Sequence, residues 1–212
     1  MKVGLTGGIA SGKSVVGEMF VALGAHLVQA DRIAHQLMLP GQPVYDEVVR
    51  HFGSAMLNSD GTVNRAKLAE AAFGKSPTAA ASRIEELNRI VHPAVIRRQE
   101  EWMEETRRQD PGSVAIVEAA LILEAGAAKG FDRLIVVTCS DEQRIARFAA
   151  RQKLDFEAAR KEVARRMAAQ LPDAEKIKAA DFVIDNSGSL DRTREQVCEV
   201  WKKLCSVAIT KL

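Results

Sequence analysis

Residues 7–14 read Gly-Gly-Ile-Ala-Ser-Gly-Lys-Ser and match the phosphate-binding pattern G-x-x-x-x-G-K-[ST]. Glycines let the backbone pass close to phosphate oxygens and point its N–H groups at them. The Lys13 ammonium suits the terminal phosphates of a nucleoside triphosphate, and the Ser14 hydroxyl suits its Mg²⁺ ion. An apolar segment precedes the pattern and a helix is expected after it, which is the setting that such a loop needs. The sequence therefore predicts a triphosphate site, with Ser14 as metal ligand, that consists of Gly8, Ile9, Ala10, Ser11, Gly12, Lys13, Ser14 and Val15.

Two carboxylates follow predicted strands, at the ends that meet at the catalytic edge of a parallel sheet. Asp31 comes just after the strand predicted at Ala25–Gln29, and we expect it to orient or deprotonate the hydroxyl that accepts a phosphate. The alternative for Asp31 is a helix N-cap, a position that favours aspartate. Glu118, near the end of a later strand, either holds a Mg²⁺-bound water or, like Glu124, pairs with a nearby base.

Six arginines lie within 23 residues: Arg144, Arg147, Arg151, Arg160, Arg165 and Arg166. The first three are spaced i, i+3 and i+7, so that they share one face if the segment is helical. Guanidinium groups on such a segment can close over transferring phosphates as a lid that excludes water. The alternative is a solvated helix face that pairs with Asp155, Glu157 and Glu162. We expect at least one of the six to clamp the nucleotide or to take part in catalysis.

Five short apolar segments have the length and composition of buried strands: Lys2–Thr6, Ala25–Gln29, Val114–Ala119, Leu134–Thr138 and Phe182–Ile184. Helical segments separate them, among them Lys13–Leu23, a long charged stretch at Asp141–Ala180 and a C-terminal helix that ends near Cys205. Strands that alternate with helices in this way predict an α/β fold with a five-stranded parallel sheet buried on both faces.

The segment between the second and third strands is too long for a simple crossover. It is mostly helical over Val44–Gln109, after a break at Pro40–Pro43, and it contains a turn signal at Asn58–Arg65. Pro93 must end or kink a helix after His92. We expect this region to be a helical insertion on the substrate side of the sheet.

Composition narrows the class of protein. The chain has 212 residues and a formal net charge of +2, so bulk charge does not indicate a nucleic-acid partner. No run of 18 apolar residues and no signal-peptide pattern is present, so we expect neither membrane insertion nor secretion. Three unpaired-looking cysteines, Cys139, Cys198 and Cys205, fit a reducing compartment. We therefore expect a cytoplasmic protein.

Three classes of proteins with this loop differ in what else they need. A regulatory GTPase needs a guanine-reading Asn/Thr-Lys-x-Asp stretch, which the sequence lacks. A motor ATPase is larger and has a strand that ends in Asp or Asp-Glu. A small-molecule kinase fits the length, the helical insertion and the late arginines.

The motifs together resemble the dephospho-CoA kinase family. The matching pieces run in the family's order over nearly the whole chain: GLTGGIASGKS at 4–14, VQADRIAHQL at 28–37, His92-Pro93, ALILEAG at 120–126, Arg147 and Arg151 in RIARFAAR, RMAAQLP at 166–172, and ADFVIDNSGS at 180–189. The loop alone is shared by many families, whereas the ordered set and the late ADFVIDN stretch are specific.

The resemblance implies transfer of the γ-phosphate of ATP to the ribose 3′-hydroxyl of dephospho-CoA, with Mg²⁺. Asp31 matches the aspartate that acts on this hydroxyl, Arg147 matches an arginine near the phosphates, and Lys13 completes the expected catalytic set. His92 either lies in the acceptor site or packs at the proline bend. Asp185 and Asn186 either border the adenine or form a turn.

The implied architecture is a three-layer sandwich of the P-loop NTPase type in a single kinase domain. Its nucleotide-binding core covers about 1–30 and 113–212, its helical acceptor-binding insertion about 31–112, and its arginine-rich lid about 150–172. Two other functions stay open at this point: a kinase for another small acceptor, such as a nucleoside monophosphate or a sugar, and an ATP-binding regulator without phosphotransfer.

The sequence departs from the family pattern at several positions. Ala10 stands where glycine is common, which we expect a right-handed backbone to tolerate. Val15 replaces a threonine, so a hydroxyl to the α-phosphate is absent while the backbone N–H remains. Ala120 replaces a proline, and the segment between Arg151 and Gln170 looks a few residues longer than usual.

Overall fold

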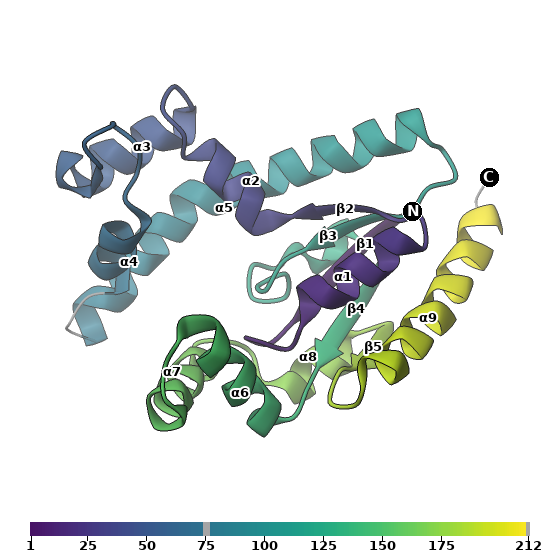
Figure 1. The fold of residues 1–212 in the computed structure, drawn as a ribbon. Coiled ribbons are helices and arrows are strands. Elements are labelled where there is room, and N and C mark those ends of the chain that lie inside the picture. Colours follow the sequence, from purple (N-terminus) through teal and green to yellow (C-terminus); the bar gives the residue numbers. More distant parts are fainter. Residues whose placement is uncertain (74–76, 211–212) are drawn as a thin grey trace. The chain divides into compact units, whose positions relative to one another are not determined.

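A computed structural model describes residues 1–73 and 77–210 (Figure 1). The chain divides into two compact units, each of which is described by itself. The larger unit consists of Met1–Gln29 and Trp102–Leu212, and the smaller of Ala30–Glu101. Helix α5, Pro77–Gln109, contributes residues to both.

The larger unit is built on five parallel strands in the order β2-β3-β1-β4-β5. These are β1 (Lys2–Gly7), β2 (His26–Gln29), β3 (Ala115–Glu118), β4 (Arg133–Thr138) and β5 (Phe182–Asp185). All five predicted strands are present, and each observed end lies within one residue of the predicted end. Because the strands are parallel, their carboxyl ends meet at one edge, from which the loops after β1 and β4 leave.

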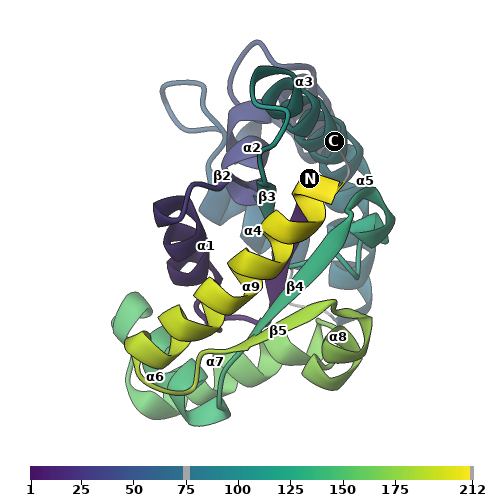
Figure 2. The ribbon, with the colours of Figure 1, turned by 90° about the vertical axis from the view of Figure 1, so that its right-hand side faces the viewer.

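Helices and short turns cover both faces of this sheet (Figures 1 and 2). Helices α1 (Lys13–Ala22) and α9 (Leu190–Thr210) pack on one face, with a core that includes Val3, Leu5, Phe20, Val137 and Val197. Alternate residues of the same strands face the other way: Leu134 and Val136 pack with Ile122, and Val117 packs with Met103 of α5. The predicted α/β three-layer arrangement is confirmed.

The charged segment predicted at Asp141–Ala180 forms three helices: α6 (Asp141–Gln152), α7 (Phe156–Ala168) and α8 (Asp173–Ala179). Lys153 ends α6 in a left-handed conformation, with φ of 55°. Asp155 then caps α7, because its side chain accepts a hydrogen bond from the Ala158 N–H at 2.8 Å. A further 3₁₀ turn, η2 (Ala127–Gly130), precedes β4.

The smaller unit is helical, with α2 (Ala30–Leu37), α3 (Pro43–Phe52), the 3₁₀ turn η1 (Ser54–Met56), α4 (Arg65–Phe73) and the first part of α5. Of the two outcomes predicted at Pro93, an end or a kink of the helix, the end does not occur, since α5 continues through it. Proline removes one N–H donor and crowds one carbonyl, and the other hydrogen bonds of a helix of 33 residues outweigh that loss.

Two observations bear on the environment of the protein. None of the helices among the described residues is long and apolar enough to cross a membrane. Cys139, Cys198 and Cys205 are all free thiols.

Candidate active site

The phosphate-binding loop, residues 8–12, joins β1 to α1. The Ser11 N–H donates to the Gly8 carbonyl at 3.3 Å, and Gly12 forms the N-cap of α1 with φ of 92° and no capping side chain. A Cβ atom on Gly12 would lie 2.1 Å from Nδ2 of Asn186, so only glycine fits there. Among the described residues, nothing accepts from the N–H groups of Ser14 and Val15, which leaves them for an anion at the positive end of the helix.

Side chains outside the loop hold its carbonyl groups. The Ser11 carbonyl accepts hydrogen bonds from Nδ2 of Asn186 at 2.9 Å and from Nη1 of Arg147 at 3.3 Å. The Ile9 carbonyl accepts from Nη1 of Arg144 at 2.9 Å. In a trans peptide the N–H and C=O groups point in opposite directions. The N–H groups that follow these two carbonyls therefore face away from the three side chains, as a phosphate-binding loop requires.

Lys13 lies over the loop. Its Nζ donates to the carbonyl oxygens of Gly7 at 2.9 Å and Gly8 at 3.0 Å. The ammonium charge is thus held beside the backbone that would surround a phosphate, and phosphate oxygens would compete with these carbonyls as acceptors.

A second polar group joins three elements at the carboxyl edge of the sheet. Glu118, at the end of β3, is 8% exposed and accepts from Oγ of Ser14 at 2.7 Å and from Nε2 of Gln29 at 2.9 Å. The strand register explains the second contact, since Gln29 and Glu118 are paired residues of β2 and β3. Hydroxyl and carboxylate oxygens are the ligands that Mg²⁺ prefers, so this pair fits the metal of a nucleotide.

The alternative for the two glutamates was pairing with a base. The hydrogen-bond partners of Glu118, Ser14 and Gln29, are neutral donors, so neither is a base. Glu124 does pair with one: its Oε1 lies 3.0 Å from Nζ of buried Lys176 and also accepts from the Leu171 N–H at 3.0 Å.

The six arginines have different surroundings. Arg147 lies against the loop, because it donates to the Ser11 carbonyl and also to the Asn186 carbonyl at 2.9 Å. The guanidinium of Arg151 lies over the ring of Phe148. The predicted solvated pairing is found on α7: Arg160 pairs with Glu157 at 3.0 Å, Arg165 with Glu162 at 2.8 Å, and Arg166 with Glu162 at 2.6 Å. The two arginines lower the pKa of Glu162 to about 2.

Asp31 lies in the first turn of α2 and belongs to the smaller unit. Its exposed carboxylate makes no hydrogen bond or ion pair among the described residues, so nothing there supports the N-cap alternative. His92 is half-buried within α5, and burial lowers its pKa. A neutral, packed imidazole agrees with the packing alternative for His92.

The expectation of a right-handed backbone at Ala10 is wrong, because its φ is 53°. This left-handed conformation costs a residue with a Cβ roughly 1–2 kcal/mol. The loop geometry imposes it, and the thiol of Cys139 lies 3.8 Å from the Ala10 carbonyl, within range of a weak S–H hydrogen bond. Burial raises the pKa of Cys139, which keeps this thiol protonated and able to donate.

Two residues that hold the loop were not identified in this role from the sequence. Asn186 is 2% exposed and fixes the Ser11 carbonyl, whereas the sequence suggested a turn or a neighbour of adenine. Arg144 is buried beneath the loop and pairs with Asp173, whereas the sequence placed it on an arginine face. Burial of an arginine shows only in the fold, so no sequence signal separates Arg144 from its neighbours.

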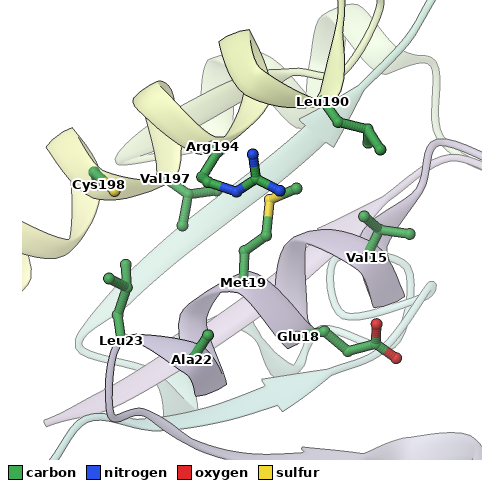
Figure 3. Close-up of a pocket in the computed structure, with 9 residues that line it drawn as sticks. All are labelled: Val15, Glu18, Met19, Ala22, Leu23, Leu190, Arg194, Val197 and Cys198. Carbon is green, nitrogen blue, oxygen red and sulfur yellow. The ribbon is translucent and has the colours of Figure 1, made fainter.

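A separate groove of about 360 Å³ lies between α1 and α9 (Figure 3). Val15 and Met19 of α1, and Leu23 just after it, line this groove on the side of α1. The side chain of Val15 thus lines this groove, so that its backbone N–H is the group left for a nucleotide.

Groups of three or more His, Cys, Asp or Glu that could hold a metal ion are absent from the described residues.

Comparisons with known proteins identify the family of the chain. A model of the family described as dephospho-CoA kinase matches residues 1–192. A relative named dephospho-CoA kinase, from Syntrophotalea carbinolica, is 40% identical over 208 residues, which covers 95% of this chain and 91% of the relative.

Solved structures share the fold. A crystal structure of a Thermus thermophilus protein is 30% identical, with a TM-score of 0.76 and coverage of 96% of both chains. A dephospho-CoA kinase from Campylobacter jejuni is 24% identical, with a TM-score of 0.60 and the same coverage, and shows the fold alone. With a phosphate-binding loop, a family match over most of its length and a relative at 40% identity, the chain belongs to the dephospho-CoA kinase family.

Proposed function

We propose that the protein transfers the γ-phosphate of ATP to the 3′-hydroxyl of the ribose of dephospho-CoA, which yields CoA and ADP in the last step of coenzyme A synthesis. The observation that supports this most is the family match over residues 1–192, which includes both the phosphate-binding loop and Asp31. The assignment of the acceptor is based on the family, and the assignment of the donor is based on the loop itself.

The donor phosphates would bind to the loop. The N–H groups of Ala10 and Gly12 face away from the side chains that bind the carbonyls. Those of Ser14 and Val15 have no acceptor among the described residues. All four would bind the phosphate oxygens. Lys13 would exchange its carbonyl contacts for the β- and γ-phosphates and stabilise the charge that develops on them during transfer. Arg147, held against the loop, is the arginine that we assign to the same phosphates.

Ser14 and Glu118 would hold Mg²⁺. The hydroxyl of Ser14 would be the direct ligand and the carboxylate of Glu118 would hold a metal-bound water, and the two oxygen groups lie 2.7 Å apart. When bound, the ion would neutralise negative charge on the phosphates.

Asp31 is the residue that we assign to the acceptor. Its carboxylate would accept the proton of the 3′-hydroxyl while the 3′ oxygen forms a bond to the γ-phosphorus and the bond from that phosphorus to the bridging oxygen breaks. ADP leaves with the bridging oxygen, and the proton passes from Asp31 to solvent. Chain connectivity supports the assignment: Asp31 is two positions after Gln29, so their Cα atoms are at most about 7.6 Å apart, and Gln29 donates to Glu118.

The remaining architecture follows the same assignment. We place the nucleotide-binding core at about 1–30 and 113–212, the acceptor-binding insertion at about 31–112, and the lid at about 150–172, which includes α7. Free thiols support a reducing, cytoplasmic setting.

The test is Mg²⁺-dependent ADP release with a panel of acceptors at equal concentration: dephospho-CoA, a nucleoside monophosphate, a sugar and buffer alone. We expect dephospho-CoA to stimulate release far above the others. A larger stimulation by another acceptor would identify a different small-molecule kinase. Tight ATP binding without turnover under any acceptor would identify a regulator.

A further inference from the structure

A fully buried guanidinium lies beneath the phosphate-binding loop. Arg144, on α6, is 0% exposed, and its Nη1 donates to the Ile9 carbonyl at 2.9 Å. Its Nη2 donates to Oδ2 of Asp173 at 2.5 Å, and its Nε lies 3.6 Å from a carboxylate oxygen of Asp141. Arginines are almost never fully buried unless they are paired, so the pairing with Asp173 explains how this charge can lie inside the protein.

The position of the guanidinium also restricts which residue fits at position 8 of the loop. A Cβ atom on Gly8 would lie 2.1 Å from Nη1 of Arg144, so glycine is needed at this position to make room for the arginine. Gly8 would otherwise be explained only by the close approach of a phosphate. The loop therefore contacts Arg144 on one side, which leaves its other side for the ligand.

The contact with the Ile9 carbonyl sets the direction of one peptide. Because this carbonyl points at Arg144, the N–H of Ala10 in the same peptide points the opposite way. Ala10 is also the loop residue with the unfavourable left-handed conformation. A peptide next to such a residue tends to rotate toward a relaxed conformation, and the hydrogen bond from Arg144 opposes that rotation.

Asp173 connects this contact to a neighbouring element. It is the first residue of α8, which follows α7 after a short loop. The pair thus joins α6, α8 and the phosphate-binding loop, and all three belong to the larger unit.

We propose that Arg144, neutralised by Asp173, is a positioning residue that holds the Ile9–Ala10 peptide with its N–H toward the phosphates of ATP. This inference rests on the proposed role of the loop in binding ATP, but not on the identity of the acceptor.

The first experiment compares wild-type protein with Arg144→Met by calorimetric titration of ATP, together with steady-state kinetics. A hydrogen bond to a charged group is worth roughly a 10- to 100-fold change in an equilibrium constant. We expect Kd and KM for ATP to rise about 10-fold or more, and KM for dephospho-CoA to change less than about threefold. The matched control is Arg194→Met, which removes an exposed arginine that pairs with Asp191 on α9 and should leave both affinities unchanged.

A second variant separates positioning from folding. Arg144→Met leaves Asp173 without its partner, so Arg144→Met/Asp173→Asn removes both charges and avoids an uncompensated one. We expect this double variant to unfold cooperatively and still to bind ATP about 10-fold or more weakly, because the Ile9 carbonyl has lost its donor.

A third variant tests the link to Ala10. Glycine adopts left-handed conformations freely, so Ala10→Gly should reduce the loss of ATP affinity that Arg144→Met causes. Additive effects would show that Arg144 does not act on this peptide.

The outcomes are distinct. Wild-type protein that binds no ATP would contradict the proposed function itself. Wild-type ATP affinity in a folded Arg144→Met or double variant would overturn the inference alone. An equal loss of affinity for ATP and for dephospho-CoA would also overturn it, because it would indicate general structural damage.

Discussion

At the scale of single residues, the loop carries Ala10 and Val15, two departures from the family pattern, and side chains from elsewhere hold its backbone. Ala10 takes a left-handed conformation that glycine would take without strain, and Val15 offers only its backbone N–H. The donors that fix the loop come from outside it, from Arg144, Arg147 and Asn186. The orientation of the loop carbonyls therefore depends on side chains from outside the loop.

Ala10→Gly should stabilise the protein. It removes a strain of roughly 1–2 kcal/mol and costs roughly 0.5–1 kcal/mol in the entropy of the unfolded chain. We expect the free energy of unfolding, measured by urea denaturation, to rise by about 0.5–1 kcal/mol. The control is Ala146→Gly, at an exposed position inside α6, which should lower it by about 1 kcal/mol. A loss of stability in Ala10→Gly would contradict the strain at this position.

Asp31→Asn should lower kcat by about 100- to 10,000-fold, because an amide cannot accept the hydroxyl proton. KM for ATP should change less than about threefold, since the donor binds elsewhere. Asp46→Asn is the matched control, as Asp46 is an exposed acid in the first turn of α3 in the same unit. If Asp31→Asn raised KM for ATP and left kcat unchanged, Asp31 would not act on the acceptor.

At the scale of elements, parallel strands bring distant residues to one edge. Glu118 of β3 meets Gln29 of β2 through the strand register and meets Ser14 at the start of α1. On α7, by contrast, Arg160, Arg165 and Arg166 form ion pairs with glutamates on their own helix. The arginines of one charged segment thus include some that are held at the loop and others that pair on an exposed surface.

Glu118→Gln should weaken the response to Mg²⁺. Residues that hold a metal through water or position its ligand typically change metal affinity by about 10- to 100-fold. We expect the Mg²⁺ concentration for half-maximal activity to rise by that factor, while the Kd of ATP measured without Mg²⁺ stays the same. The exposed Glu142→Gln on α6 should change neither value. An unchanged Mg²⁺ requirement would exclude Glu118 from the metal site.

Glu162→Gln tests the exposed pairs on α7. The folded pKa of Glu162, about 2, lies below its usual value near 4.5, so the pair stabilises the protein above about pH 4.5 and loses this effect as the pH falls toward 2. Because the site is partly exposed, we expect a cost below about 1 kcal/mol at pH 7 in chemical denaturation. The difference from wild type should shrink between pH 4.5 and pH 2, and a constant difference would rule out this pairing as its source.

At the scale of the whole molecule, local patterns predicted much of the fold and part of the site. The strands follow from apolar runs, and the loop follows from residues 7–14, since both depend on neighbours in sequence. The continuation of α5 through Pro93, the left-handed Ala10 and the burial of Arg144 depend on packing across the chain. Nothing in local sequence distinguishes an arginine beneath a loop from one on a helix surface.

The most direct test of the account is to determine where the phosphate goes. Wild-type protein is incubated with ATP, Mg²⁺ and dephospho-CoA, and the product is analysed by ³¹P NMR, with the 3′-deoxy analogue of dephospho-CoA as the matched acceptor. The account predicts a new phosphate ester at the ribose 3′ oxygen, equimolar ADP, and no transfer to the 3′-deoxy analogue. Equal ADP release with both acceptors, or a phosphate at any other position, would contradict it.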